Sequence, residues 1–150
     1  MKILIGYDGS ESAASALHDL QRAGLPNDAE ALVVSVADVT MAPAQSNYEI
    51  FEHAVTSRRA TSGLLLAQKQ STRVLLEAKA FTTRASERLR SYFPDWQVSA
   101  QEPAGQPFQE LIKKADEWKP DLVVVGSQGL SLAARLILGS VSRKIVTDSH

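Results

Sequence analysis

The feature that most constrains the fold is a set of short, almost continuous apolar runs. Residues 3–5, 32–36 and 122–125 consist almost entirely of isoleucine, leucine and valine. A strand with one solvated face alternates apolar and polar residues, whereas a strand buried on both faces does not. Each run is therefore predicted to be a strand of a parallel sheet with both faces covered. Residues 96–100 are predicted to be one further short strand.

Helical segments separate these runs. Residues 11–24 are rich in helix-forming residues and end at a glycine, while Asp8 and Ser10 both precede them as candidate caps. Residues 105–118 carry a proline near their start, which suits the first turn of a helix. We therefore expect one helix before the second strand and another before the last one.

The long stretch 54–93 is also predicted to be helical, because it contains no proline. A single helix of that length exceeds the usual range, so residues near 58–63 are expected to form a separate turn. One apolar helical stripe is predicted to consist of Val74, Ala78, Phe81, Ala85 and Leu89.

Alternating strands and helices predict an α/β fold: an open doubly wound parallel sheet with helices on both faces, Rossmann-like, in a single domain over residues 1–150. Right-handed crossovers leave a crevice where the strand order reverses, and ligands bind there. Asp8 and Gly126 each follow a predicted strand, so we expect them to meet at this crevice. Residues 38–53 are expected to form a long loop, which either gates the crevice or merely elaborates the surface.

Three glycines, Gly126, Gly129 and Gly139, follow the last apolar run. On one interpretation each of them simply serves a turn or a helix start. On the other, the three together leave main-chain N–H groups unobstructed by side chains. A helix beginning near Ser140 would add first-turn N–H groups and the positive end of its dipole, and Ser142 would add a hydroxyl. Two such donor sites suit an extended polyanion such as a nucleotide polyphosphate.

The stretch GSQGLSLAARLILGSVS fits Gly-x2-Gly-x9-Gly-Ser, and on this pattern the chain resembles the ATP-binding subgroup of the universal stress protein family. KILIGYDGSESAASAL and GQPFQELIKKADEWKPDLVVVGSQG also resemble that family, whose fold is adenine nucleotide alpha-hydrolase-like. The resemblance is weakest over residues 40–96. It implies a nucleotide-binding set of Gly6, Tyr7, Asp8, Val36, Val125, Gly126, Gly129, Arg135, Gly139, Ser140, Val141 and Ser142.

The resemblance also implies roles within this set. The turn over residues 6–8 would lie against adenine and ribose, and Val36 would contact the base. Residues 125–129 would form the ribose and phosphate turn, and residues 139–142 the phosphate cradle. Alternatives remain for two charged residues, since Asp8 either meets the base end or caps the helix, and Arg135 either contacts phosphate or is solvated. The role of Tyr7 is open.

ATP is the expected ligand, with AMP, ADP or a cyclic nucleotide as alternatives, and Mg²⁺ or Mn²⁺ would be held through phosphates rather than by a protein metal site. We expect a nucleotide-responsive regulatory module. The alternatives are a slow ATP hydrolase, for which Asp8 is the single catalytic candidate, and a ligand-independent stress-related interaction protein. The sequence predicts no dedicated catalytic residue.

Composition bears on the partners. The net charge of −1 favours neither nucleic acid nor a membrane as a partner. The absence of cysteine excludes a thiolate metal site. A cytoplasmic protein is expected. Family members usually continue into a fifth, apolar edge strand that often supplies a homodimer contact. No such strand is recognisable here, so either the chain is shortened or another chain covers the edge. A homodimer is expected on the resemblance alone.

Overall fold

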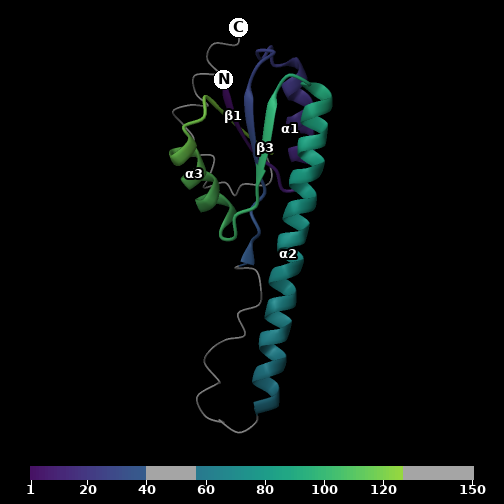
Figure 1. Ribbon diagram of the computed structural model, residues 1–150, viewed down its shortest axis with the longest axis vertical. Coiled ribbons are helices and arrows are strands. Elements are labelled where there is room, and N and C mark those ends of the chain that lie inside the picture. The colour runs from purple at the N-terminus through teal and green to yellow at the C-terminus, as the bar shows by residue number, and fades with distance from the viewer. Residues whose placement is uncertain (40–56, 127–150) are drawn as a thin grey trace.

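The computed structural model describes residues 1–39 and 57–126, the side chains of residues 57–62 and 64 excepted (Figure 1). The elements follow the predicted alternation of strands and helices. In chain order they are β1 (Lys2–Gly6), α1 (Glu11–Asp19), the short 3-10 helix η1 (Leu20–Arg22), β2 (Glu30–Val34), α2 (Ser57–Tyr92), β3 (Gln97–Gln101), α3 (Pro107–Trp118) and β4 (Leu122–Val125).

The four strands form one parallel sheet in the order β3-β2-β1-β4. The chain therefore adds β2 and β3 on one side of β1 and then returns to place β4 on the other. In this register Gly6 pairs with Val34 on β2 and with Val125 on β4. The predicted α/β class and doubly wound parallel sheet are confirmed.

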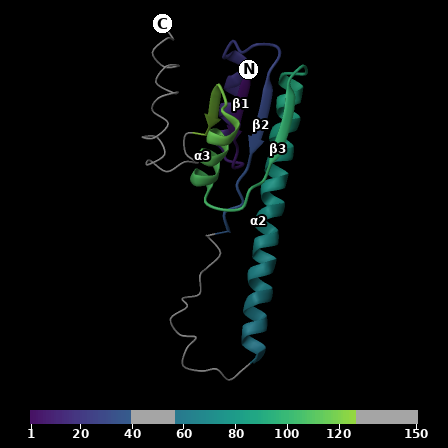
Figure 2. The same ribbon diagram turned by 60° about the vertical axis from the view of Figure 1, so that its left-hand side comes forward.

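The direction of each crossover determines which face its helix covers. Right-handed crossovers that move in opposite directions along a sheet place their helices on opposite faces. Accordingly α1 and α2 lie on one side of the strands and α3 lies on the other (Figure 1), an arrangement that the rotated view also shows (Figure 2). The expectation of helices on both faces is confirmed.

Strand β1 provides the centre of both core layers. Its residues Ile3, Leu4 and Ile5 are at most 1% exposed. Because successive side chains of a strand point to opposite faces, the two isoleucines pack on the α1–α2 side and Leu4 packs on the α3 side, where Leu111 of α3 joins it. This double burial explains why the strand sequences do not alternate between apolar and polar residues.

Helix α2 is continuous over 36 residues, so the expected separate turn near residues 58–63 is wrong. No proline interrupts it, and a Cβ built on Gly63 would meet nothing within 4 Å. An interior glycine costs only about 1 kcal/mol relative to alanine, which is less than the cost of breaking the helix. The predicted stripe is confirmed, since Ala78, Ala85 and Leu89 are buried and its other two members are half-buried.

Two expectations concern residues outside the described ranges. The predicted loop over 38–53 falls almost entirely on residues 40–56, and its gating role goes untested with it. The expected absence of a fifth strand concerns residues 127–150. Within the described residues, β4 lies at one edge of the sheet.

Replacing Leu89 with alanine should destabilise the protein, because this side chain is fully buried between α2 and the sheet. We expect a loss of about 2–5 kcal/mol in the free energy of unfolding, measured by urea denaturation. Leu66→Ala on the same helix is the matched control, since Leu66 is 66% exposed, and its effect should stay within about 0.5 kcal/mol. Equal losses in the two variants would contradict the placement of the core.

Candidate functional site

The strand order reverses between β1 and β4, so a crevice is expected outside the carboxyl ends of these two strands. Gly6 and Val125 end the two strands in matched register. Helix α1 leaves from the β1 side of this position, and α3 covers the opposite face. The predicted site residues that the structure describes all lie at or just beyond the carboxyl ends of β1, β2 and β4.

Gly6 lies where the main chain closely approaches its neighbours. A Cβ at this position would lie 3.0 Å from the Val125 Cγ1 and 3.1 Å from the Leu111 Cδ2. Such distances are tighter than ordinary van der Waals contact, so a larger residue would push β4 or α3 outward. The close packing of β4 and α3 against the end of β1 therefore favours glycine at this position.

The turn after β1 shows which of its polar residues caps α1. The Ser10 side chain accepts a hydrogen bond from the Ala13 N–H at 3.2 Å and is therefore the N-cap of α1. The Asp8 Oδ1 instead accepts from the Ser10 N–H at 3.0 Å, which closes the turn ahead of the helix. Asp8 is exposed, so its carboxylate stays available at the strand end.

Tyr7 contributes its side chain to the core rather than to the crevice. The residue is 3% exposed, and its ring meets that of Phe81 edge to face with centroids 6.5 Å apart. Its N–H donates to the Val34 carbonyl at 2.9 Å. The role that the sequence left open for Tyr7 is thus, in this structure, a packing role for its ring.

Val36 and Val125 form part of the apolar layer beneath α3. Val36 lies two residues past the end of β2, because that strand stops at Val34 rather than at the predicted residue 36. Both side chains are half-buried, so each keeps some exposed surface.

Gly126 packs against the first turn of α1. A Cβ here would lie 2.6 Å from the Ala13 nitrogen and 2.7 Å from the Ser12 Oγ, which no real side chain tolerates. Its φ lies outside the left-handed region. Close packing, and not a positive φ, therefore requires glycine at this position. It brings β4 and the start of α1 together at the predicted crevice.

Sequence reasoning missed Ser12 and Phe81, both of which support this region. Ser12 lies against Gly126, and Phe81 packs against Tyr7 and Gly9. The signal for Ser12 was its place in the first helical turn. No local signal connects Phe81 to a turn more than seventy residues earlier in the chain. The remaining predicted site residues, Gly129, Arg135, Gly139, Ser140, Val141 and Ser142, lie outside the described ranges.

The described ranges contain no group of three or more histidine, cysteine, aspartate or glutamate side chains arranged to hold a metal ion. Over residues 1–39 and 57–126, no helix has both the length and the apolar character that crossing a membrane requires. Near the carboxyl ends of β1, β2 and β4 the structure thus places the half-buried Gly6, the buried Gly126, the exposed Asp8 and the half-buried Val36 and Val125.

Comparison with known proteins decides the family. The sequence profile described as the universal stress protein family matches residues 1–150. The chain belongs to this family. A putative universal stress protein of Staphylococcus haemolyticus, SH1215, is 31% identical over 146 residues, which cover 96% of this chain and 76% of that protein. The universal stress protein YxiE of Bacillus subtilis is 26% identical over 147 residues, which cover 96% of this chain and 90% of that protein.

Solved structures of universal stress proteins share the fold. The protein MJ0577 superimposes with a TM-score of 0.63 at 21% identity, covering 99% of this chain and 90% of that one. A universal stress protein in complex with cAMP gives a TM-score of 0.54 at 26% identity, covering 98% and 90%. An Arabidopsis thaliana member of the family with AMP bound gives 0.51 at 14% identity, covering 92% and 83%, and supports the fold alone.

Replacing Gly9 with alanine should destabilise the turn after β1. Gly9 has a φ of +78°, and an added Cβ would overlap the Phe81 ring. We expect a loss of about 1–3 kcal/mol in the free energy of unfolding. Gly63→Ala is the control, because it fills open space within a helix and should stabilise by up to about 1 kcal/mol. If denaturant melts show Gly9→Ala to be neutral, the described turn is wrong.

Proposed function

We propose that this universal stress protein binds ATP in the crevice between β1 and β4 and acts as a nucleotide-responsive regulatory module. The observation that carries the proposal is the convergence of main chain at the strand-order reversal. Gly6 ends β1 there, and Gly126 follows β4 against the start of α1. Ligands of open α/β sheets bind at this topological position.

The described walls suit the adenosine end of such a ligand. Val36 and Val125 offer accessible apolar surface against which an adenine ring would stack. The exposed Asp8 carboxylate would accept hydrogen bonds from ribose hydroxyls or the base, and a position at that end keeps it away from the phosphates. A carboxylate beside a triphosphate would instead repel it.

The relative in complex with cAMP supports an adenine nucleotide as the ligand, because that protein is 26% identical over almost the whole chain. The choice of ATP rests on the Gly-x2-Gly-x9-Gly-Ser pattern over residues 126–140. Main-chain N–H groups and hydroxyls at Gly129, Gly139, Ser140 and Ser142 would hold the phosphates, with Arg135 as a further cation. Mg²⁺ or Mn²⁺ would bind through the phosphates.

The proposal also covers how nucleotide binding would regulate a partner, and the location and oligomeric state of the protein. A ligand alters partner binding only when it binds two conformations with different affinity, and a ligand spanning α1, β1 and β4 is placed to do so. Serines that hold phosphate position it without accelerating its transfer, so binding rather than catalysis is the proposed activity. We further propose that the protein is cytoplasmic and homodimeric, in keeping with its family.

Freshly purified protein should carry adenine nucleotide, detectable by mass spectrometry after denaturation. Stripped protein should gain stability with ATP, since a ligand that binds the folded state stabilises it. A dissociation constant near 10 µM would give about 2.7 kcal/mol with about 1 mM ATP, or a rise of about 5–10 °C in the melting temperature.

Comparing the rise in melting temperature with ATP, ADP, AMP and cAMP identifies the preferred nucleotide. The same measurement with GTP tests recognition of the base. An unchanged melting temperature with all the adenine nucleotides, together with no bound nucleotide, would refute the proposal. Accumulation of ADP at catalytic rates would instead favour the hydrolase.

Asp8→Asn should weaken ATP binding while leaving the ligand-free protein stable. The asparagine Oδ1 can still accept the Ser10 N–H, so the turn is retained while the charge is lost. Losing a charge-assisted hydrogen bond of about 1 kcal/mol would lower the affinity about fivefold in calorimetric titration. Asp19→Asn, at the exposed end of α1, is the matched control and should bind as the parent does. An unchanged affinity for Asp8→Asn would remove this residue from the site.

A further inference from the structure

Helix α2 carries a charge opposite to that of the rest of the chain. Residues 57–92 contain eight lysines and arginines and two glutamates, a formal charge of +6. The remaining residues contain eight basic and fifteen acidic side chains, a formal charge of −7. The net charge of −1 thus conceals a strongly basic helix on an acidic body. The stretch 63–77 contributes Lys69, Arg73 and Glu77 to this charge, a formal +1, so the cations that a partner of this stretch would meet are Lys69 and Arg73.

The amino-terminal half of α2 lies beyond the sheet. The helix is about 54 Å long, whereas a five-residue strand spans about 17 Å. Its buried side chains, from Ala78 to Leu89, all lie in the carboxyl-terminal half, and none of the described side chains of residues 63–77 is buried. Figures 1 and 2 show this half extending past the strands.

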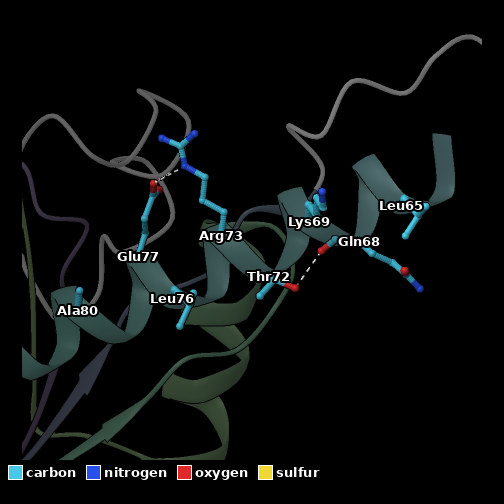
Figure 3. Close-up of a pocket in the computed structure, with 8 residues that line it drawn as sticks. All are labelled: Leu65, Gln68, Lys69, Thr72, Arg73, Leu76, Glu77 and Ala80. Atoms are coloured by element: carbon cyan, nitrogen blue, oxygen red, sulfur yellow. Dashed lines mark hydrogen bonds and ion pairs between the residues drawn. The ribbon is translucent and has the colours of Figure 1, made fainter. Parts of the chain in front are cut away.

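Large apolar side chains remain exposed on this extension. Leu65 and Leu76 are 52% and 64% exposed, and Leu66 and Leu75 are 66% and 41% exposed. Residues eleven apart return to the same side of a helix after three turns, so Leu65 and Leu76 form one row with Thr72 between them. Figure 3 shows the two leucines pointing to the same side of the helix.

A charged row runs beside this apolar row. Lys69, Arg73 and Glu77 are spaced four residues apart, and at about 100° per residue Lys69 lies about 20° and Arg73 about 60° around the helix from Leu76 (Figure 3). The Arg73 Nε lies 3.1 Å from the Glu77 Oε1, while the structure records no acidic partner for the Lys69 ammonium within the described residues. Together the two rows line a shallow groove along the helix surface.

We propose that the surface formed by Leu65, Lys69, Thr72, Arg73 and Leu76 docks an acidic amphipathic helix of a partner protein. A narrow apolar row flanked by charges is the arrangement by which two helices pair. Glutamates flanking the partner's own apolar row would meet Lys69 and Arg73, and its leucines would cover Leu65 and Leu76.

Two other anionic partners fit this surface less well. A helix that lies on a membrane keeps its apolar and charged faces apart, whereas here the basic row separates Leu66 from Leu65 and Leu76. Nucleic acid would use the cations but leave the leucines exposed, and the described part of the extension offers no aromatic side chain for stacking. An acidic amphipathic helix would contact both the cations and the leucines of the surface.

The test uses the full chain without added nucleotide, so its outcome does not depend on ATP binding. The probe is a synthetic peptide of about three heptads with leucine at positions a and d and glutamate at e and g, and the comparison peptide has lysine at e and g. Fluorescence anisotropy should show at least about tenfold tighter binding of the acidic peptide. Leu65→Ala with Leu76→Ala should weaken that binding about tenfold while circular dichroism stays unchanged.

Charge reversal gives a readout that loss of structure would not produce. Lys69→Glu with Arg73→Glu should invert the preference, so that the basic peptide binds tighter. Arg22→Glu with Lys113→Glu changes two exposed cations elsewhere and should leave the preference as it was. The proposal is overturned if the acidic peptide does not bind at about 100 µM or if both peptides bind the parent equally.

Three alternative occupants of this surface are assayed in parallel, and a positive result for any of them would overturn the proposed one. Vesicles of phosphatidylcholine and phosphatidylserine test a membrane surface, and a random-sequence DNA duplex tests nucleic acid. Binding of either that exceeds peptide binding and is lost on reversal of Lys69 and Arg73 overturns the acidic helix. Analytical ultracentrifugation tests whether a second copy of this chain occupies the surface. Loss of self-association in the double variant Leu65→Ala with Leu76→Ala would identify that copy as the occupant.

Discussion

The pairing of β1 with both of its neighbours holds the rest of the molecule in place. Its central residues are fully buried, and it hydrogen-bonds to β2 on one edge and to β4 on the other. The amino ends are joined as well, because the Lys2 N–H donates to the Asp121 Oδ2 at 2.7 Å and the Asp121 N–H donates to the Lys2 carbonyl at 2.8 Å. All carboxyl ends therefore finish in one row. The position of the candidate crevice follows from this register and not from any side chain within it.

Two glycines at that row are required by close packing. Gly126 is required because α1 lies where its Cβ would be, and Gly6 because Val125 and Leu111 are equally close. Close packing at these two positions brings strand ends and a helix start together at the candidate crevice.

The parts of the fold that sequence could predict are those determined by local patterns. The continuous apolar run ending at Val125 gave the bounds of β4 without error, and the proline-started helix was placed within two residues. Strand β2 ends earlier than its apolar run. Beyond Val34 the regular ladder gives way to isolated contacts with the segment that follows β3, where the Ala37 N–H donates to the Pro103 carbonyl at 2.8 Å. The edge-to-face contact between Tyr7 and Phe81 could not be foreseen, since it joins residues far apart in the chain. Net charge was also misleading, because averaging hides the basic helix.

The length of α2 has a mechanical consequence. Its carboxyl-terminal half is packed on β2 and β3, while roughly 20 residues project from it as a rigid rod of about 30 Å. A tilt of about 10° in the packed half would sweep the far end through about 5 Å by geometry alone. Small adjustments beside the sheet would in this way be amplified into displacements large enough for another molecule to sense.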